Sequence, residues 1–259
     1  MMPAPLAHTW YMAVRHLRIL MRQPWYMALT LFQPIVYLLL FGALFSKVVQ
    51  IPGFGSASYV SFLAPGIVVM TALFSAGWNG MGMVNDLDRG VMDRFLTTPV
   101  RRGALMMGGL VQLAVVILIQ SAIILTLAFI RGASFPGGAA GMAVVVVSAI
   151  LLAVPFGALS NGIALLARKE ETVIAAVNFV LLPLVFVSGV FMAQNLMPHW
   201  MQTVAHYNPV NWAVTAGREA VGSSVDWGVV WTRLGLLAGF ALVCAFLATQ
   251  AFRAYQRSI

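Results

Sequence analysis

Six long stretches of the chain contain no charged residue, and they determine the expected secondary structure. In an apolar solvent a helix satisfies its backbone polar groups internally, and about 20 apolar residues cross the hydrocarbon core of a bilayer. Each charge-free stretch holds one segment of this kind. The predicted spans are residues 26–45, 59–83, 104–130, 142–167, 172–193 and 231–252.

The stretch that holds the fifth span is too long for one crossing, and its second half is more polar. Burying the histidines and asparagines of residues 194–216 in lipid would cost free energy. We therefore expect residues 194–230 to form an outer re-entrant segment of short helices, because Pro198 can open a helix and Asn208–Pro209 can end one. An irregular surface loop and a seventh span are the alternatives.

The first residues of the chain form an amphipathic pattern. In residues 1–24, apolar side chains share one helical face, and Arg15, Arg18 and Arg22 lie on the opposite face. This pattern favours an interfacial helix in the cytoplasmic headgroup layer, which Pro24 ends before the first span. An ordinary cytoplasmic helix is the alternative.

The composition agrees with a membrane protein. The chain is 61% hydrophobic and 8% charged, whereas soluble domains carry about a quarter charged residues. The net charge of +8 comes from short basic clusters between apolar blocks. That distribution indicates membrane topology and contact with the lipid bilayer, and it argues against nucleic-acid binding.

The basic residues also predict the orientation. Eleven Lys and Arg residues fall on the side of both termini, and four fall on the other side. Because cytoplasmic loops are enriched in Lys and Arg, both termini are expected in the cytoplasm. The larger set is Arg15, Arg18, Arg22, Arg89, Arg94, Arg101, Arg102, Arg168, Lys169, Arg253 and Arg257, and the smaller is Lys47, Arg131, Arg218 and Arg233.

Several kinds of chemistry are missing from the sequence. Neither Lys47 nor Lys169 follows a glycine, so the chain has no phosphate-binding loop for ATP. Zinc-protease spacing and the serine nucleophile elbow are also absent. The interiors of the six spans carry no Asp, Glu, Lys, Arg or His, which argues against a proton-driven pump. We expect no catalytic residue, no metal and no cofactor bound by this chain.

Uncharged polar residues within the spans are candidates for a substrate path, and interhelical hydrogen bonding is the alternative for each. They are Gln33, Asn79, Gln112, Gln120, Asn161 and Asn178. Two pairs of small residues at helical spacing, Ala76 with Gly80 and Gly235 with Gly239, predict close helix packing. We assign both pairs to packing within the subunit, and dimerisation is the alternative.

The longest charged segment, residues 84–103, lies on the predicted cytoplasmic side. Acids and arginines alternate along it, and a small apolar face includes Phe95 and Leu96 before Pro99. An amphipathic helix here would dock on a cytoplasmic partner, whereas a solvated loop would not.

Together the charged segment and the outer segment resemble the ABC transporter type-two permease family. The first matches an acid, a glycine, an apolar pair, Thr-Pro and a basic pair through Asp86, Gly90, Phe95, Leu96, Thr98, Pro99, Arg101 and Arg102. The second matches Ser-Gly, Pro-x-Trp, Asn-Pro and a closing arginine through Ser188, Gly189, Pro198, Trp200, Asn208, Pro209 and Arg218. The run from Asp88 to Phe95 is similar to daunorubicin-resistance-type permeases. Asp86 departs from the Glu that many members carry.

The resemblance implies a single permease domain over residues 1–259. Its fold would be an all-α membrane protein with six transmembrane helices, an N-terminal interfacial helix, a cytoplasmic coupling helix and outer re-entrant helices, as in type V ABC exporters. It would pair with a second permease subunit, like or unlike, and with a cytoplasmic ATP-binding subunit that holds ATP and Mg. The residues that would couple to that ATPase are Asp86, Asp88, Arg89, Gly90, Asp93, Arg94, Phe95, Leu96, Pro99, Arg101 and Arg102.

The expected function is export of a hydrophobic or amphipathic compound, such as a drug-like natural product or a lipid, across a bacterial inner membrane. The direction follows from the resemblance alone. Export of a lipid-linked saccharide or polymer is the alternative within transport. A membrane-embedded enzyme or scaffold is the alternative from a different class.

Overall fold

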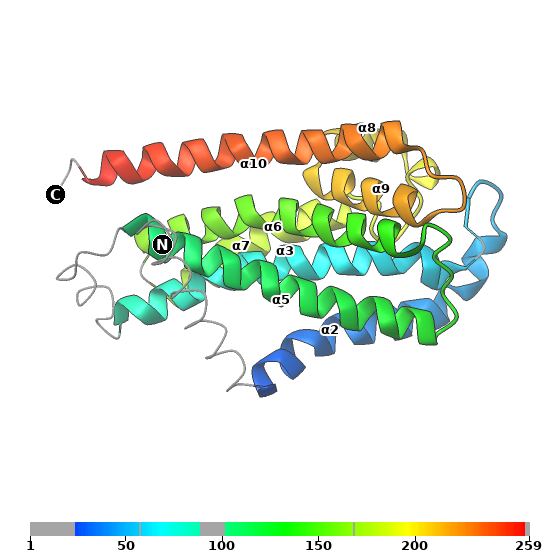
Figure 1. Ribbon diagram of the computed structural model, residues 1–259, viewed down its shortest axis with the longest axis horizontal. Helices are drawn as coiled ribbons and strands as arrows, with labels where there is room; N and C mark the ends of the chain where they lie inside the picture. The colour runs from blue at the N-terminus through cyan, green and yellow to red at the C-terminus, as the bar shows by residue number, and fades with distance from the viewer. Residues whose placement is uncertain (1–23, 57, 89–101, 168, 257–259) are drawn as a thin grey trace, which may run out of the picture.

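The computed structural model describes residues 24–56, 58–88, 102–167 and 169–256, and within these ranges every regular element is a helix (Figure 1). The elements are α2 (Pro24–Leu44), η1 (Ser46–Gln50), α3 (Tyr59–Asp88), α5 (Arg102–Ile130), α6 (Gly138–Ala167), α7 (Glu170–Phe186), η2 (Gln194–Leu196), α8 (His199–Tyr207), α9 (Pro209–Val221) and α10 (Trp227–Gln256). The all-α prediction is confirmed for this part of the chain. Residues 1–23 of the expected interfacial helix lie outside the described residues.

Each predicted span overlaps one helix, because each charge-free stretch is apolar enough to propagate a helix between polar ends. The fifth span is a correction: it was expected to reach residue 193, but α7 ends at Phe186. The Ser188 amide bonds the carbonyl three residues back at Val185, which tightens the last turn. The Gly189 amide then donates to the side chain of Asn211 on α9, so a tertiary hydrogen bond replaces the intrahelical one at this position.

Four helices in the described ranges are long and apolar enough to cross a membrane, namely α3, α5, α6 and α10. A shorter apolar stretch, Ala28–Leu44, lies in α2, and α7 has 17 residues. The chain is therefore a multi-pass helical protein by length and composition, and the count of six spans stays a prediction.

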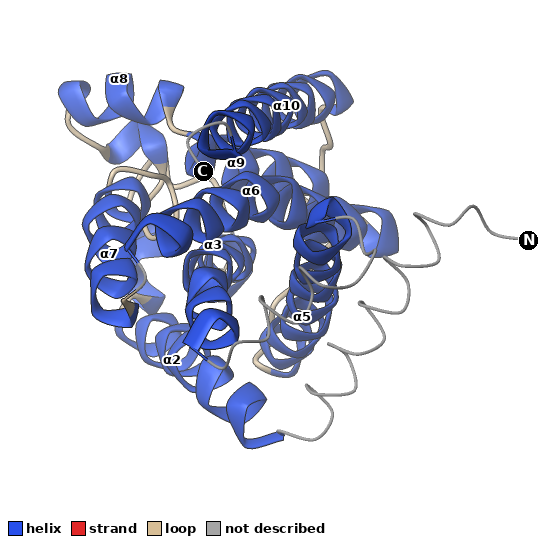
Figure 2. Cartoon of the chain, turned by 90° about the vertical axis from the view of Figure 1, so that its left-hand side faces the viewer, coloured by secondary structure: helices blue, strands red, loops and turns tan. Residues whose placement is uncertain are grey.

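Helix α3 is the centre of the bundle. It contacts α2, α5, α6, α7 and α9. In the apolar stretch of α3 that is long enough to cross a membrane, 78% of the residues are buried. Viewed end on, these helices surround it, whereas α10 lies at the edge against α6 and α9 (Figure 2). In the corresponding apolar stretch of α10, only 22% of the residues are buried.

Glycine allows the closest approach between α3 and α6. A Cβ atom at Gly80 would lie 2.5 Å from the carbonyl oxygen of Ser160, so no larger residue fits without a shift of the backbone. The Ala76–Gly80 pair thus marks packing within the subunit, as predicted. The same prediction is wrong for Gly235 and Gly239, since a Cβ at either would meet nothing within 4 Å among the described residues.

The two ends of the bundle differ. The segment between α2 and α3 lies at the same end as α8 and α9, and the opposite end carries the last turn of α3 and the C-terminal end of α10 (Figure 1). The first end is the predicted outer side, and the second is the predicted cytoplasmic side. Two short helices, α8 and α9, occupy the segment expected to re-enter the membrane, and their position relative to a bilayer stays a prediction.

Candidate functional site

A half-buried arginine, Arg218, holds the outer end of the bundle together. The Arg218 Nε atom donates to the Phe62 carbonyl at 2.9 Å, and Nη2 donates to the Val190 carbonyl at 2.8 Å. The guanidinium carbon lies 3.4 Å from the centroid of the Phe62 ring, a cation–π contact. Burial lowers the pKa of the Arg218 guanidinium to about 9, which leaves it charged at neutral pH. One charged side chain of α9 therefore ties α3 to the loop that follows α7.

Asn208 and Pro209 start α9 rather than only ending α8. The Asn208 side chain accepts a hydrogen bond from the Val210 amide at 2.9 Å, and Pro209 stands at the first helical position. The Asn208 amide group also donates to the Leu184 carbonyl at 2.7 Å, which attaches the start of α9 to the end of α7.

Ser188 and Gly189 form the turn that receives these contacts. The Ser188 hydroxyl donates to the Val185 carbonyl at 2.6 Å, and the Gly189 amide donates to Asn211 Oδ1 at 3.1 Å. A Cβ at Gly189 would lie 3.0 Å from that oxygen and 3.2 Å from Arg218 Nη1, so the turn has little room for a side chain. The sequence analysis missed Asn211, although a polar residue among the small apolar residues of a predicted helix was a signal.

The other two residues of the outer motif do not join this network. Pro198 and Trp200 stand at the start of α8, where both are exposed, Trp200 by 61%. The motif therefore separates into an inner group of five, Ser188, Gly189, Asn208, Pro209 and Arg218, and an exposed pair on α8.

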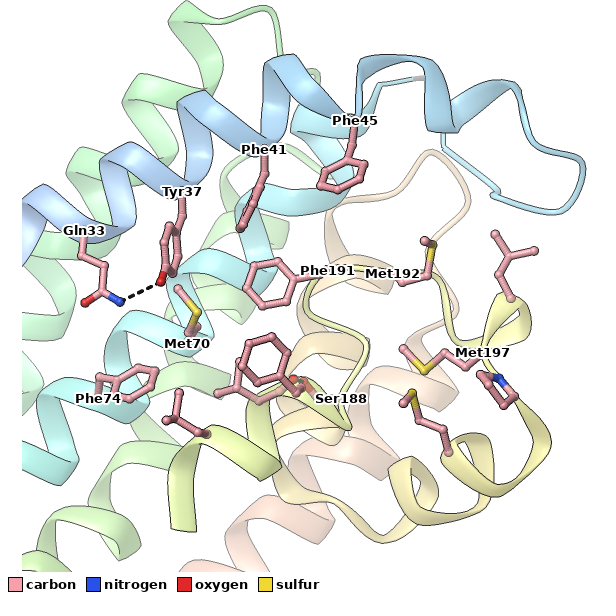
Figure 3. A pocket seen from close by; sticks show the side chains of 16 residues that line it. Gln33, Tyr37, Phe41, Phe45, Met70, Phe74, Ser188, Phe191, Met192 and Met197 are labelled. Carbon is pink, nitrogen blue, oxygen red and sulfur yellow. Dashed lines mark hydrogen bonds between the residues drawn. The ribbon is translucent and has the colours of Figure 1, made fainter. Parts of the chain in front are cut away.

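A cavity of about 500 Å³ lies between α2, α3, α7 and the segment that leads into α8; we call it the aromatic cavity (Figure 3). It is lined by Gln33, Tyr37, Phe41, Phe45, Met70, Phe74, Leu182, Val185, Phe186, Ser188, Phe191, Met192, Leu196, Met197, Pro198 and Met201. The Phe191 ring packs edge-on against Phe41, with 5.4 Å between centroids. Figure 3 shows Tyr37 and Phe41 of α2, and Phe45 directly after it, pointing into the cavity around this ring.

Sequence analysis named only three residues that line the aromatic cavity: Gln33, Ser188 and Pro198. The aromatic residues of the first predicted span stand four positions apart at 37, 41 and 45, so the helical period already placed them on one face. The helical spacing does not predict which other elements this face packs against. Gln33 belongs to the same face, and its amide donates to the Tyr37 hydroxyl at 3.1 Å.

A second, smaller cavity of about 50 Å³ lies between α2, α3 and α5; we call it the polar cavity. Three residues of the expected substrate path, Asn79, Gln112 and Gln120, line it together with Thr30, Ser75, Trp78, Leu113 and Val116. The Ser75 hydroxyl donates to Gln120 Oε1 at 3.0 Å, and Gln120 Nε2 donates to Thr30 Oγ1 at 3.3 Å.

The remaining polar candidates behave differently. Asn161 on α6 accepts a hydrogen bond from Asn79 at 3.0 Å, which links α6 to α3. Asn178 donates to its own helix at the Ile174 carbonyl and lines neither cavity. The structure thus brings four of the six expected path residues together, Asn79, Gln112, Gln120 and Asn161, and leaves Gln33 and Asn178 apart.

Most of the predicted coupling residues, from Arg89 to Arg101, lie outside the described residues. Asp86 and Asp88 belong to the last turn of α3 and Arg102 begins α5, but their side chains are also outside the description. Beside them, the Asn85 amide group donates to Glu170 Oε1 at 2.5 Å and joins the end of α3 to the start of α7.

The chain is similar in sequence to a known family and to individual transport proteins. The profile of the family described as ABC-2 type transporter matches residues 7–221. The daunorubicin resistance ABC transporter permease protein DrrB1 of Streptomyces coeruleorubidus is 28% identical over 256 residues, which cover 96% of this chain and 86% of that protein. The inner membrane transport permease YadH of Escherichia coli K12 is 26% identical over 231 residues, which cover 83% of this chain and 85% of that protein.

Proposed function

Because the chain belongs to the ABC-2 type transporter family, we propose that it is the membrane-spanning permease subunit of an ATP-driven exporter. The family expected from the two motif segments is confirmed. The cargo we propose is a hydrophobic or amphipathic compound, drug-like or lipid, and the relative DrrB1 is named for daunorubicin resistance. The observation that carries this proposal is the aromatic cavity between α2, α3 and α7.

The size and lining of the aromatic cavity support a compact cargo. Its volume of about 500 Å³ lies in the range of about 300–1,000 Å³ typical of small-molecule sites. Aromatic rings and methionines adapt to apolar ligands of different shapes. A cavity of this kind favours a small amphipathic molecule over a lipid-linked polymer, which would need an extended polar channel.

The energy source in this proposal is a separate cytoplasmic ATP-binding subunit, because the sequence has no phosphate-binding loop. ATP and Mg would bind there, and this chain would hold no cofactor. Two permease subunits would form the transporter in a bacterial inner membrane, with both termini in the cytoplasm. The type V exporter arrangement of six spans, with α8 and α9 re-entering from the outside, belongs to this proposal.

The test of the proposal is reconstitution of the chain with its ATP-binding subunit in lipid vesicles. We expect ATP-dependent movement of a fluorescent amphipath such as Nile red, and no movement with a non-hydrolysable ATP analogue. Transport by the permease without the second subunit, or no transport with both, would contradict the proposal.

Removal of one ring from the aromatic cavity is expected to weaken cargo binding. In the variant Phe41→Ala, the edge-on contact with Phe191 is lost. An aromatic contact contributes about 0.5–1.5 kcal/mol, so the cargo concentration for half-maximal transport should rise about two- to tenfold. Phe129→Ala on α5 is the control, since Phe129 is 69% exposed and lines neither cavity. Equal effects of both variants would argue against the cavity as the binding site.

Charge reversal in the coupling segment is expected to separate ATP hydrolysis from transport. The variant Asp86→Lys keeps the helix end but inverts the charge offered to the ATP-binding subunit, and Phe95→Pro breaks the expected coupling helix. Vesicle transport should fall about tenfold or more, as for loss of a charged interface contact, while ATP hydrolysis continues. Asp86→Glu is the control and should keep coupling. Unchanged transport in both disruptive variants would refute the role of residues 84–103.

A further inference from the structure

The aromatic cavity and the polar cavity are lined by neighbouring residues of α2 and α3. Gln33 lines the first and Thr30, one helical turn away on α2, lines the second. On α3, Phe74 lines the aromatic cavity, and its ring lies 6.1 Å from the ring of Trp78, which lines the polar cavity. The end of the aromatic cavity near Gln33 and Phe74 therefore lies close to the polar cavity.

The two cavities offer different chemistry, and neither offers a charge. Rings and methionines dominate the larger cavity, whereas hydroxyl and amide groups dominate the smaller. No Asp, Glu, Lys, Arg or His occurs among the described residues that line either one. A buried charge needs an opposite charge or several hydrogen bonds, so an ionised ligand end would be disfavoured here.

Within the polar cavity, Gln112 stands apart from the other amides. Gln120 is bonded to Ser75 and Thr30, and Asn79 is bonded to Asn161. The half-buried Gln112 side chain makes no hydrogen bond to another described residue. An amide in an apolar bundle without a partner costs free energy unless something else bonds to it. Gln112 thus keeps both a donor and an acceptor available at the cavity wall.

The geometry points to a cargo that is an uncharged amphipath. Its apolar, ring-containing body fills the aromatic cavity, and a neutral hydrogen-bonding end, such as a hydroxyl, carbonyl or carboxamide, reaches Gln112 in the polar cavity. The inference rests on the proposed function, since it names the class of molecule that the permease would move. Gln112 is the residue that selects this end, and the volume of about 50 Å³ limits the end to one or two groups of the size of water.

The test uses diphenylhexatriene probes with one body and three different ends: hydroxymethyl, propionate and trimethylammonium. Their binding to the full chain in lipid nanodiscs is measured by energy transfer from tryptophan, with protein-free nanodiscs as background. The hydroxymethyl probe should bind about tenfold or more tightly than either charged probe, because neither cavity supplies a counter-charge. Equal binding of the three probes, or tighter binding of a charged one, would overturn the inference.

The variant Gln112→Met tests the selecting residue. The exchange keeps the length of the side chain and removes no hydrogen bond to a described residue, so the fold should be retained. We expect it to lower the affinity for the hydroxymethyl probe to that for unsubstituted diphenylhexatriene. Asn178→Leu is the matched control, because Asn178 bonds only its own helix and lines neither cavity, and it should leave the order of affinities unchanged. An unchanged hydroxymethyl preference in Gln112→Met would refute the role of Gln112.

Failure of the inference and failure of the proposed function give different results. If the three probes are moved equally in ATP-driven vesicles, the permease function stands and the neutral-end inference falls. If the hydroxymethyl probe binds preferentially but no probe moves with ATP and the partner subunit, the site stands and the transport proposal falls.

Discussion

Replacing Arg218 by methionine is expected to destabilise the outer end of the bundle by about 3 kcal/mol or more. The reason is the loss of two hydrogen bonds from a charged donor, each of which contributes about 1.5–3 kcal/mol. Methionine fills a similar volume but removes the guanidinium hydrogen bonds to the Phe62 and Val190 carbonyls. It also removes the cation from the face of the Phe62 ring. Thermal unfolding of the purified protein in detergent would measure the loss, and vesicle transport should disappear with it.

Two further variants separate charge from geometry at this position. Arg218→Lys keeps the positive charge, but one ammonium group cannot reproduce a planar fork that bonds two carbonyls, so a partial loss is expected. Arg131→Met removes a positive charge from an exposed position on the same predicted side and should change little. If Arg218→Met were as stable as Arg131→Met, the arginine would not be holding the outer end together.

Replacing Gly80 by alanine is expected to have the second largest effect. The new Cβ would lie 2.5 Å from the Ser160 carbonyl oxygen and 2.6 Å from its hydroxyl. The Gly80 amide also donates a hydrogen bond to Ser160 Oγ at 3.1 Å, which the shift would break. Because the nearest atom belongs to the backbone of α6, the two helices must move apart, and overpacking of this kind costs about 1–3 kcal/mol. A lower unfolding temperature and a weaker yield of monodisperse protein are the readouts.

Gly239→Ala is the matched control on a helix of similar length. Gly239 lies in α10, where a Cβ meets nothing within 4 Å among the described residues. Alanine is the better helix former by about 1 kcal/mol, so this variant should be neutral or slightly more stable in the single subunit. Destabilisation of both variants to the same extent would show that helix propensity, rather than contact with Ser160, controls the result.

The aromatic cavity shows how far a periodic pattern reaches. Helical spacing places Tyr37, Phe41 and Phe45 on one face of the first apolar segment. That face meets α3, α7 and Phe191, which follows more than 140 positions later, only because the whole bundle is assembled. A local pattern describes a face, whereas the partner of the face depends on the packing of helices distant in sequence.

The sequence by itself determined the membrane-helix class, the approximate extent of the long helices and the family. These follow from local quantities: apolar runs long enough to cross a bilayer, and short motifs with fixed spacing. The tertiary structure alone decided that α7 stops at Phe186 and that Gly80 is packed while Gly239 is open. It also decided which amides meet at the polar cavity and that Arg218 bonds the Phe62 and Val190 carbonyls. Hydropathy cannot resolve these points, because every face of a lipid-embedded helix is apolar and only contact with a neighbour distinguishes one face from another.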